Sequence, residues 1–296
     1  MSRLFLFPLA LFVCLFASPP SQAATATCTE WNFFDLPAPW APGSLARGIN
    51  RWGTVVGYGF QNGNAKTLSF IRFKGGSVIT YDFPNSSGTF LSRRNRFGVT
   101  VGSYYDNNPS GQRAHGVVVS GNNSVTVDYP GAYHTNLSSI NSYGAIVGSH
   151  STQAGVTDGF KLKDGTFRRV HYPNSTFTSP TDINDQGTIV GTYSDQKNQG
   201  HGFVRENGIY KTLDYAKAVP PESVLLTGIN GSGTIVGFFY NGPIPQSFIY
   251  SNGVFKDIVH PNIFYTLVWG INAFGYVVGS TDLNSGGSSM FTAHCQ

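Results

Sequence analysis

The stretch Asn230-Gly-Ser-Gly-Thr-Ile-Val-Gly237 decides the fold, because its pattern N-x-x-G-x-x-V-G recurs along the chain. The copies begin at Asn50, Asn95, Asn141, Asn184, Asn230 and Asn272, so successive copies lie 45, 46, 43, 46 and 42 residues apart. Within a copy, the Asn side chain accepts a local backbone hydrogen bond and the first Gly supplies a positive φ, which predicts a tight turn between two strands. This regular spacing predicts a repeat protein.

Each repeat divides into four short strands. For the fifth repeat they are expected at 225–229, 234–240, 246–251 and 254–260, and Asn252-Gly253 is a typical two-residue hairpin turn between the last two. Four antiparallel strands in 42 to 46 residues match one blade of a β-propeller, and no stretch has the 3.6-residue apolar period of a helix. We therefore predict an all-β chain in which residues 24–296 form a single six-bladed β-propeller with four antiparallel strands per blade.

The two ends of the chain complement each other. The last repeat stops at Gln296 after its third strand, whereas residues 28–37 align with the fourth strand of the fifth repeat, 252–261. The N-terminal strand is therefore expected to complete the last blade, a 3+1 closure. Cys28 and Cys295 both fall where the missing hairpin turn would be, and we predict a disulfide between them. In the chain-entropy model, closing so long a loop stabilises the fold by roughly 4–5 kcal/mol.

Residues 1–23 have the pattern of a secretory signal peptide. Arg3 precedes an apolar run from 4 to 17, and small residues follow up to Ala24. Cys14 leaves with this segment, so the mature chain keeps two cysteines, as expected for an exported protein with one disulfide. The run is short for a membrane span and no second one follows. We expect a secreted or periplasmic monomer without membrane insertion.

Three repeat segments carry a resemblance to a known family. They are Gly228-Ile-Asn-Gly-Ser-Gly-Thr-Ile-Val-Gly237, His201-Gly-Phe203 and Val127-Asp-Tyr-Pro-Gly-Ala132. In these segments the chain resembles the bacterial extracellular HAF-repeat family, and the resemblance covers nearly all of the mature chain. It implies a propeller-type fold and export, and no activity is established for the family. The sequence departs from the pattern where Leu68-Ser-Phe70 and Gln246-Ser-Phe248 replace His-x-Phe.

Composition excludes several classes of protein. Only 11% of residues are charged, against about 25% in an average domain, while 14% are aromatic, so the chain is not disordered. The 36 glycines have no three-residue period, which excludes collagen. The net charge of +4 comes from few ionisable groups, so we expect no nucleic-acid partner.

Motifs of known catalytic sites are missing from the sequence. It contains no H-E-x-x-H, G-x-S-x-G, P-loop or C-x-x-C, and only three glutamates. The seven histidines have no position that is common to all the repeats, so we predict neither a metal site nor a cofactor. Asp128 and three aligned acids, like His115 and His201, are interpreted as structural hydrogen-bonding groups, and Asp106 and Asp195 as turn residues rather than calcium ligands.

The candidate site consists of residues that break the repeat near the predicted central channel. The strand before each Asn should line the channel, and small residues dominate just before the Asn. The exceptions are Arg47, Arg93, Arg94, Asp182 and Trp269. A guanidinium, a carboxylate and an indole at a channel mouth fit an anionic or glycan ligand. The alternative is an internal ion pair between Arg93 and Asp182 that fills the channel, and the sequence leaves both open.

These observations favour a non-catalytic recognition module. Its ligand would be an extracellular glycan or protein, bound at the channel mouth or on the face with the variable loops, because variable loops on a rigid scaffold usually carry binding. One alternative is a propeller hydrolase or lyase that acts on polysaccharide. Another is a structural module of the cell surface.

Overall fold

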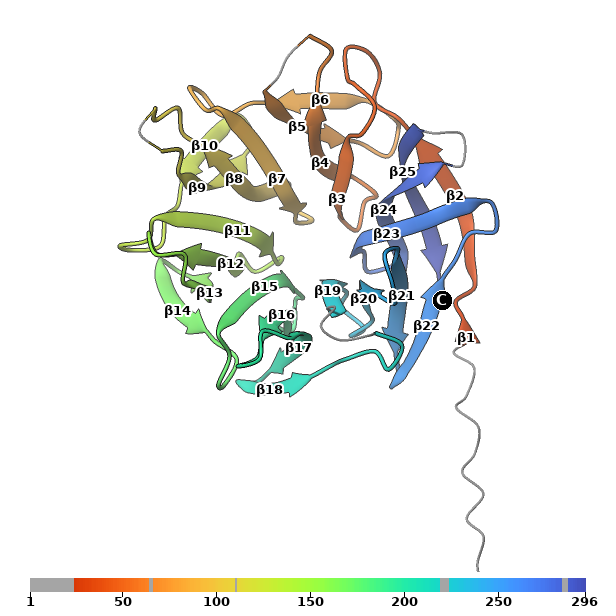
Figure 1. Ribbon diagram of the computed structural model, residues 1–296. Helices are drawn as coiled ribbons and strands as arrows, with labels where there is room; N and C mark the ends of the chain where they lie inside the picture. Colours follow the sequence, from red (N-terminus) through yellow and green to blue (C-terminus); the bar gives the residue numbers. More distant parts are fainter. Residues whose placement is uncertain (1–23, 64–65, 110, 219–223, 284–286) are drawn as a thin grey trace, which may run out of the picture.

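The computed structural model describes residues 24–63, 66–109, 111–218, 224–283 and 287–296. The expected signal peptide, 1–23, lies outside the described residues. Every element of regular structure in the described part is a β-strand, so the predicted all-β class is confirmed (Figure 1). No helix there is long and apolar enough to cross a membrane.

The strands form antiparallel sheets of four that follow one another along the chain. The first sheet contains β3 (Leu45–Ile49), β4 (Val55–Phe60), β5 (Thr67–Arg72) and β6 (Val78–Tyr81). The second contains β7 (Gly88–Arg94), β8 (Val99–Tyr105), β9 (Ala114–Ser120) and β10 (Asn123–Thr126). A bridge between Thr67 and Gly88 joins the two. The next are β11 (His134–Ile140), β12 (Ile146–Ser151), β13 (Thr157–Lys163) and β14 (Thr166–Val170), then β15 (Phe177–Ile183), β16 (Ile189–Ser194), β17 (Gly200–Glu206) and β18 (Ile209–Thr212).

The fifth repeat and the chain ends form the remaining sheets. β19 (Val224–Ile229), β20 (Ile235–Tyr240), β21 (Pro245–Ser251) and β22 (Val254–Ile258) lie within one or two residues of the predicted strands, and the short β1 (Ala24–Thr25) adds a parallel edge strand beside β22. β23 (Ile263–Ile271), β24 (Tyr276–Leu283) and β25 (Gly287–Cys295) pair in order, and β2 (Cys28–Phe34) is the fourth strand beside β25.

The sheets radiate from a central axis, as the blades of a β-propeller do (Figure 1). The strand that precedes each repeated Asn lies innermost, and each inner strand contacts the next, from β3 through to β23 and back to β3. The ends of the sheets form two faces. The turn face carries the N-x-x-G turns and the hairpins between third and fourth strands, and the loop face carries the remaining connections.

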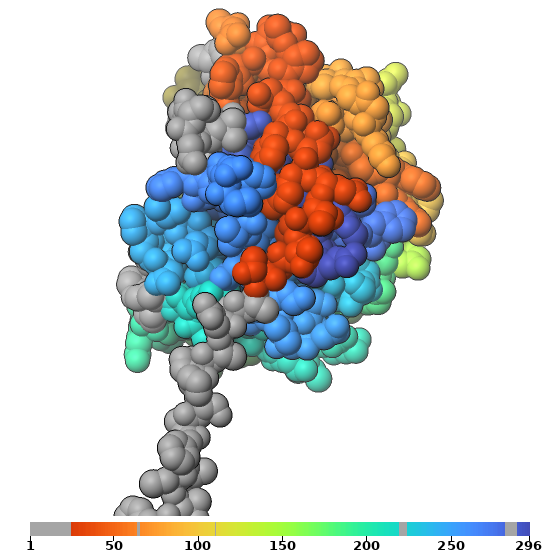
Figure 2. Space-filling model, turned by 90° about the vertical axis from the view of Figure 1, so that its right-hand side faces the viewer, coloured from red at the N-terminus to blue at the C-terminus, as the bar shows by residue number. Residues whose placement is uncertain are grey.

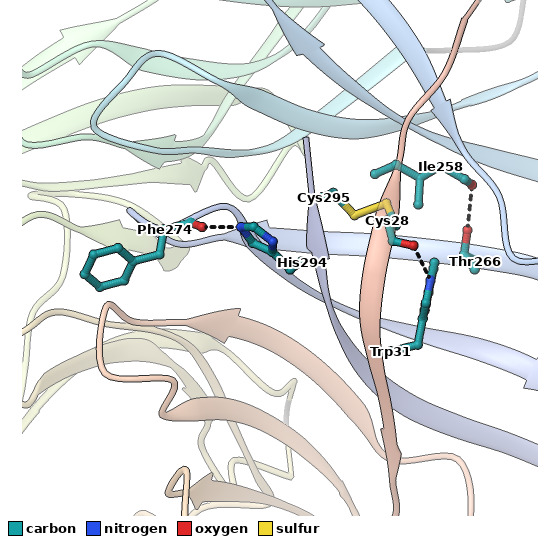
Figure 3. Close-up of a disulfide and its surroundings, with 7 residues drawn as sticks. All are labelled: Cys28, Trp31, Ile258, Thr266, Phe274, His294 and Cys295. Carbon is teal, nitrogen blue, oxygen red and sulfur yellow. Dashed lines mark hydrogen bonds between the residues drawn. A yellow bond between two sulfur atoms is a disulfide. The ribbon is translucent and has the colours of Figure 1, made fainter.

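The predicted disulfide is confirmed. Cys28 and Cys295 are paired residues of β2 and β25, joined by a disulfide with a Cα–Cα distance of 4.1 Å (Figure 3). Figure 2 shows the N-terminal segment, in orange-red, lying across the blue C-terminal strands. The two ends of the chain are therefore linked both by backbone hydrogen bonds and by a covalent bond.

The repeated Asn has two structural roles, of which the sequence predicts only the first. The side-chain oxygen of Asn230 accepts hydrogen bonds from the backbone N–H groups of Ser232 and Thr234, each at 3.0 Å, as the predicted turn requires. Its amide also donates to the carbonyl oxygen of Asn272 in the next repeat at 3.3 Å. The same donation links all six asparagines, Asn50 to Asn95, Asn141, Asn184, Asn230, Asn272 and back to Asn50.

Candidate ligand-binding site at the channel mouth

The structure brings three of the five candidate residues into one cavity. Arg47, Arg93 and Trp269, from β3, β7 and β23, line a cavity of about 470 Å³ that lies on the loop-face side of the axis. Asp182 is buried beside Arg93, whereas Arg94 lies on the turn face. The sequence therefore predicts a cluster that the structure divides into a cavity wall, a buried ion pair and a separate residue.

Arg93 bonds to the backbone of three other inner strands, β3, β19 and β23. Its guanidinium donates to the carbonyl oxygens of Thr227 at 2.5 Å and Trp269 at 2.7 Å, and also to those of Arg47 and Ser92. Its Nε lies 3.7 Å from a carboxylate oxygen of Asp182, and its side chain is only 13% exposed. The donors of Arg93 are thus engaged by the protein, and the contact with Asp182 is the internal ion pair of the alternative interpretation.

Asp182 completes the same internal network. Its carboxylate accepts hydrogen bonds from the hydroxyl of Ser139 on β11 and from the backbone N–H of Ile229 on β19, at 2.9 Å. With Arg93, these contacts connect all six inner strands, β3, β7, β11, β15, β19 and β23. Because a buried charge needs a partner to offset its loss of hydration, the pair is a structural element of the channel.

The side chains of Arg47 and Trp269 face the cavity, and they take no part in the network of Arg93 and Asp182. The guanidinium of Arg47 lies over the indole of Trp269, 3.8 Å from the ring centroid, in a cation–π contact. Trp269 is held in place by its Nε1–H, which donates to Ser280 at 3.3 Å, and by an edge contact with Phe238. Burial lowers the pKa of Arg47, as does the neighbouring Arg93, yet an arginine remains cationic at physiological pH.

The remaining wall of the cavity combines aromatic rings with hydroxyl groups. The aromatic side chains are Tyr58, Phe90, Tyr105 and Phe177, and the hydroxyls come from Ser92, Ser103, Ser138, Ser179, Thr181, Thr192 and Thr227. Aromatic faces pack against the apolar faces of sugar rings, hydroxyls exchange hydrogen bonds with ligand hydroxyls, and a cation binds an anionic group. The cavity is therefore suited to a small polar ligand that carries a ring or a negative charge.

Arg94 does not belong to this cavity, which corrects its inclusion in the cluster. It is the last residue of β7, and its guanidinium donates to the hydroxyl of Thr100 at 2.7 Å. It lines a shallow hollow at the opposite end of the axis, together with the ring of asparagines. Side chains alternate along a strand, so neighbouring positions such as Arg93 and Arg94 point in different directions.

His115 and His201 are each bonded to an aligned acid of their own blade. Nδ1 of His115 lies 2.7 Å from one carboxylate oxygen of Asp128, and the other oxygen accepts a hydrogen bond from the backbone N–H of Gly116. His201 and Asp214 repeat this arrangement at 2.7 Å, as the structural interpretation predicts. In the third repeat the two residue types are exchanged, because Asp158 and His171 occupy the corresponding positions.

The loop acids hold their own turns. A carboxylate oxygen of Asp106 accepts the backbone N–H groups of Asn108 and Arg113, and Asp195 does the same for Lys197 and Gln199. These contacts support the interpretation of both acids as turn residues. Within the described residues, no group of three or more His, Cys, Asp or Glu is placed to hold a metal ion.

Sequence reasoning missed a set of exposed aromatic residues on the turn face. They occupy the second position after the repeated Asn, and their exposed fractions are 60% for Trp52, 68% for Phe97, 62% for Tyr143 and 54% for Phe274. The signal was present in the sequence, because the same position is aromatic in four of the six repeats. The sequence does not show that these rings are exposed, because their exposure depends on where the turn lies in the fold.

Comparisons with known proteins identify the fold. A scan against models of protein families and a search of curated proteins gave no match. Among solved structures, an Aleuria aurantia lectin in complex with Fucα1-6GlcNAc is similar at 10% identity with a TM-score of 0.55, over 88% of this chain and 96% of the lectin.

Two further solved structures have the same architecture. A Trypanosoma rangeli sialidase in complex with sialic acid has 11% identity and a TM-score of 0.55, over 92% of this chain and 59% of the sialidase. The β-propeller domain of the Trilobed protease from Pyrococcus furiosus has 10% identity and a TM-score of 0.54, over 84% of this chain and 81% of that domain. At such identities the likeness concerns the fold alone, and it shows that this chain is a β-propeller.

Proposed function

We propose that the chain is an exported, monomeric recognition module, a six-bladed β-propeller that binds an extracellular glycan or protein ligand at its channel mouth. Six blades are supported by the six copies of the repeat and by the hydrogen bond from Asn272 back to Asn50. The pairing of β2 with β25 supports a closure in which the N-terminal strand completes the last blade.

Export is supported by the disulfide and by the N-terminal sequence. A disulfide between Cys28 and Cys295 persists in an oxidising compartment, which the periplasm and the outside of the cell provide. Residues 1–23 have the composition of a signal peptide, and the repeats resemble those of extracellular HAF-repeat proteins. We include membership of that family, and a mature domain over 24–296, in the proposal.

The contact between Arg47 and Trp269 carries the binding proposal. The fold does not require either residue, because the corresponding positions in the other repeats are Ser92, Ser138, Thr181 and Thr227. Both line a cavity with four further aromatic rings. The Aleuria aurantia lectin provides a precedent for sugar binding by a protein of this fold. A cation and an indole at the wall of such a cavity favour a ligand with a sugar ring or a negative charge.

A glycan array followed by calorimetry with the best ligand tests this function. Substitutions Arg47→Ala and Trp269→Ala should each weaken binding by about tenfold or more, because each removes a desolvated contact worth about 1.4 kcal/mol or more. Arg94→Ala is the control, because Arg94 lies on the other face, and it should bind as the wild type does. Binding that survives both cavity substitutions would contradict the proposal, as would turnover of the bound ligand.

A further inference from the structure

The turn face carries exposed aromatic rings that the turn itself does not need. Trp52 and Phe274 occupy the second position after the repeated Asn, where the fourth and fifth repeats carry Gln186 and Ser232. Trp52 Nε1 donates to the carbonyl oxygen of Arg96 at 3.0 Å, and Gln186 Nε2 makes the equivalent bond to Gly231 at 2.9 Å. A glutamine can therefore make the same bond, so this hydrogen bond does not explain why the position carries an indole.

The two rings border a groove of about 640 Å³ lined by cations. The guanidinium of Arg51 lies 5.1 Å from the ring centroid of Trp52 and 5.5 Å from that of Phe274. Arg72, stacked on Phe34, and Lys74 line the same groove. Within the part of the chain that the structure describes, none of these three cations forms an ion pair with a carboxylate.

The groove also contains one carboxylate, at an unusual point of the backbone. Glu30 has a φ of 53°, a conformation that non-glycine residues seldom adopt, and it lies at a register shift between β2 and β25. Its carboxylate accepts a hydrogen bond from the hydroxyl of Tyr276 at 2.5 Å. Rare backbone conformations occur preferentially at binding sites, and this one places an acceptor in the groove.

We propose that this groove is a second binding site, which takes an acidic oligosaccharide built from uronic acid units. In this arrangement a sugar ring stacks on the indole of Trp52, ligand carboxylates pair with Arg51 and Lys74, and ligand hydroxyls donate to Glu30. The site is independent of the channel mouth, because it lies at the opposite end of the axis and uses none of the same residues.

The carboxylate of Glu30 discriminates between classes of polyanion. A sugar offers hydroxyl donors to it beside its own carboxylates, whereas the phosphates and sugars of a nucleic acid would bring mainly like charge to this point. The rings also belong to separate repeats and alternate with cations, so they do not form the continuous apolar strip that a docking helix needs. The spacing of charge and ring faces fits an acidic sugar chain best.

Calorimetry with galacturonic acid hexamer as the probe tests the site in the mature, oxidised protein. The affinity for the acid should fall as salt is added. The fully methyl-esterified hexamer has the same rings without the charges, and its affinity should be lower by about tenfold or more. A single-stranded DNA hexamer should bind more weakly than the acid. Equal binding of acid and ester, tighter binding of the DNA, or no binding of the acid by the folded wild type would each overturn the proposal.

The substitution Trp52→Gln separates binding from folding. It keeps a donor for the carbonyl of Arg96, as Gln186 demonstrates, and removes only the ring face. We expect an unchanged melting temperature and about tenfold weaker binding of the acid. Arg51→Gln should have a similar effect through the lost charge, and the matched control Gln186→Ala, in a turn remote from the groove, should bind normally. Wild-type affinity in both Trp52→Gln and Arg51→Gln would refute the assignment.

Discussion

Arg93 illustrates how one residue can break a repeat for a structural reason. It replaces a small residue on an inner strand, which resembles the signature of a ligand-binding position. Its guanidinium nevertheless reaches carbonyl oxygens of Arg47, Thr227 and Trp269 and lies beside Asp182. The inner strands surround a single axis, so one long polar side chain from one blade can bond to several of the others.

Substituting Arg93 by Ala should therefore destabilise the protein strongly. The change removes one partner of a buried ion pair and leaves the carboxylate of Asp182, 8% exposed, without its cation. We expect a loss of about 3–5 kcal/mol in the free energy of unfolding, measured by urea denaturation. Arg94→Ala, at the next position, should cost less than about 1 kcal/mol. Equal effects of the two substitutions would show that Arg93 does not hold the inner strands together.

Asp195 links the stability of one loop to pH. The hydrogen bond from the backbone N–H of Gln199, the largest cause, and that from Lys197 hold the pKa of its carboxyl below the usual value of 3.8. A lowered pKa in the folded state contributes stability above the unfolded value, and this contribution disappears as pH falls through the folded pKa. The melting temperatures of the wild type and Asp195→Ala should therefore differ near neutral pH and converge as the pH falls below 3.8 and through the lowered pKa of the folded state. A constant difference across this range would contradict the assignment.

Each blade is the element that sequence reasoning describes best. The turn at Asn230 and the hairpin at Asn252-Gly253 could be recognised from the sequence because local chemistry determines them, and the strands are the segments that these turns separate. The exposed ring of Trp52 was not recognised, because exposure depends on where the finished turn lies. The donation from one Asn to the next repeat was also missed, since it exists only between packed blades.

Packing within a blade requires a glycine at the last position of the N-x-x-G-x-x-V-G pattern. In the fifth repeat, a Cβ added to Gly237 would lie 2.1 Å from the carbonyl oxygen of Leu225 and 2.9 Å from the ring of the fully buried Phe248. Because backbone and a packed ring cannot both move away, Gly237→Ala should cost about 3 kcal/mol of unfolding free energy.

The control for this prediction lies in the same repeat. Gly231 has no atom closer than 4.0 Å to an added Cβ, and the sixth repeat carries Ala273 at the same position. Gly231→Ala should leave the unfolding free energy within about 0.5 kcal/mol of the wild type. Urea denaturation of both variants measures the difference, and similar stabilities would show that the blade tolerates a side chain at Gly237.

At the scale of the whole molecule, the sequence predicts the propeller and its disulfide but not the interior of its channel. The pairing of Cys28 with Cys295 followed from the alignment of the repeats, because both residues stand at the same missing turn. The contacts of Arg93 join residues 134 and 176 positions apart, and no local pattern encodes which side chain crosses the axis. Contacts that exist only in the assembled ring therefore require the structure.

The disulfide should make the largest single contribution to the stability of the whole chain. It joins residues 267 positions apart, so in the chain-entropy model its removal costs about 5 kcal/mol. We expect the double substitution Cys28→Ser and Cys295→Ser to lower the free energy of unfolding by up to this amount, measured by urea denaturation. The loss should also appear locally, because β2 is then held to β25 by backbone hydrogen bonds alone, and amide hydrogen exchange in β2 should accelerate before that in β24. Wild-type stability and unchanged exchange in β2 would show that the ends of the chain remain joined without the covalent link.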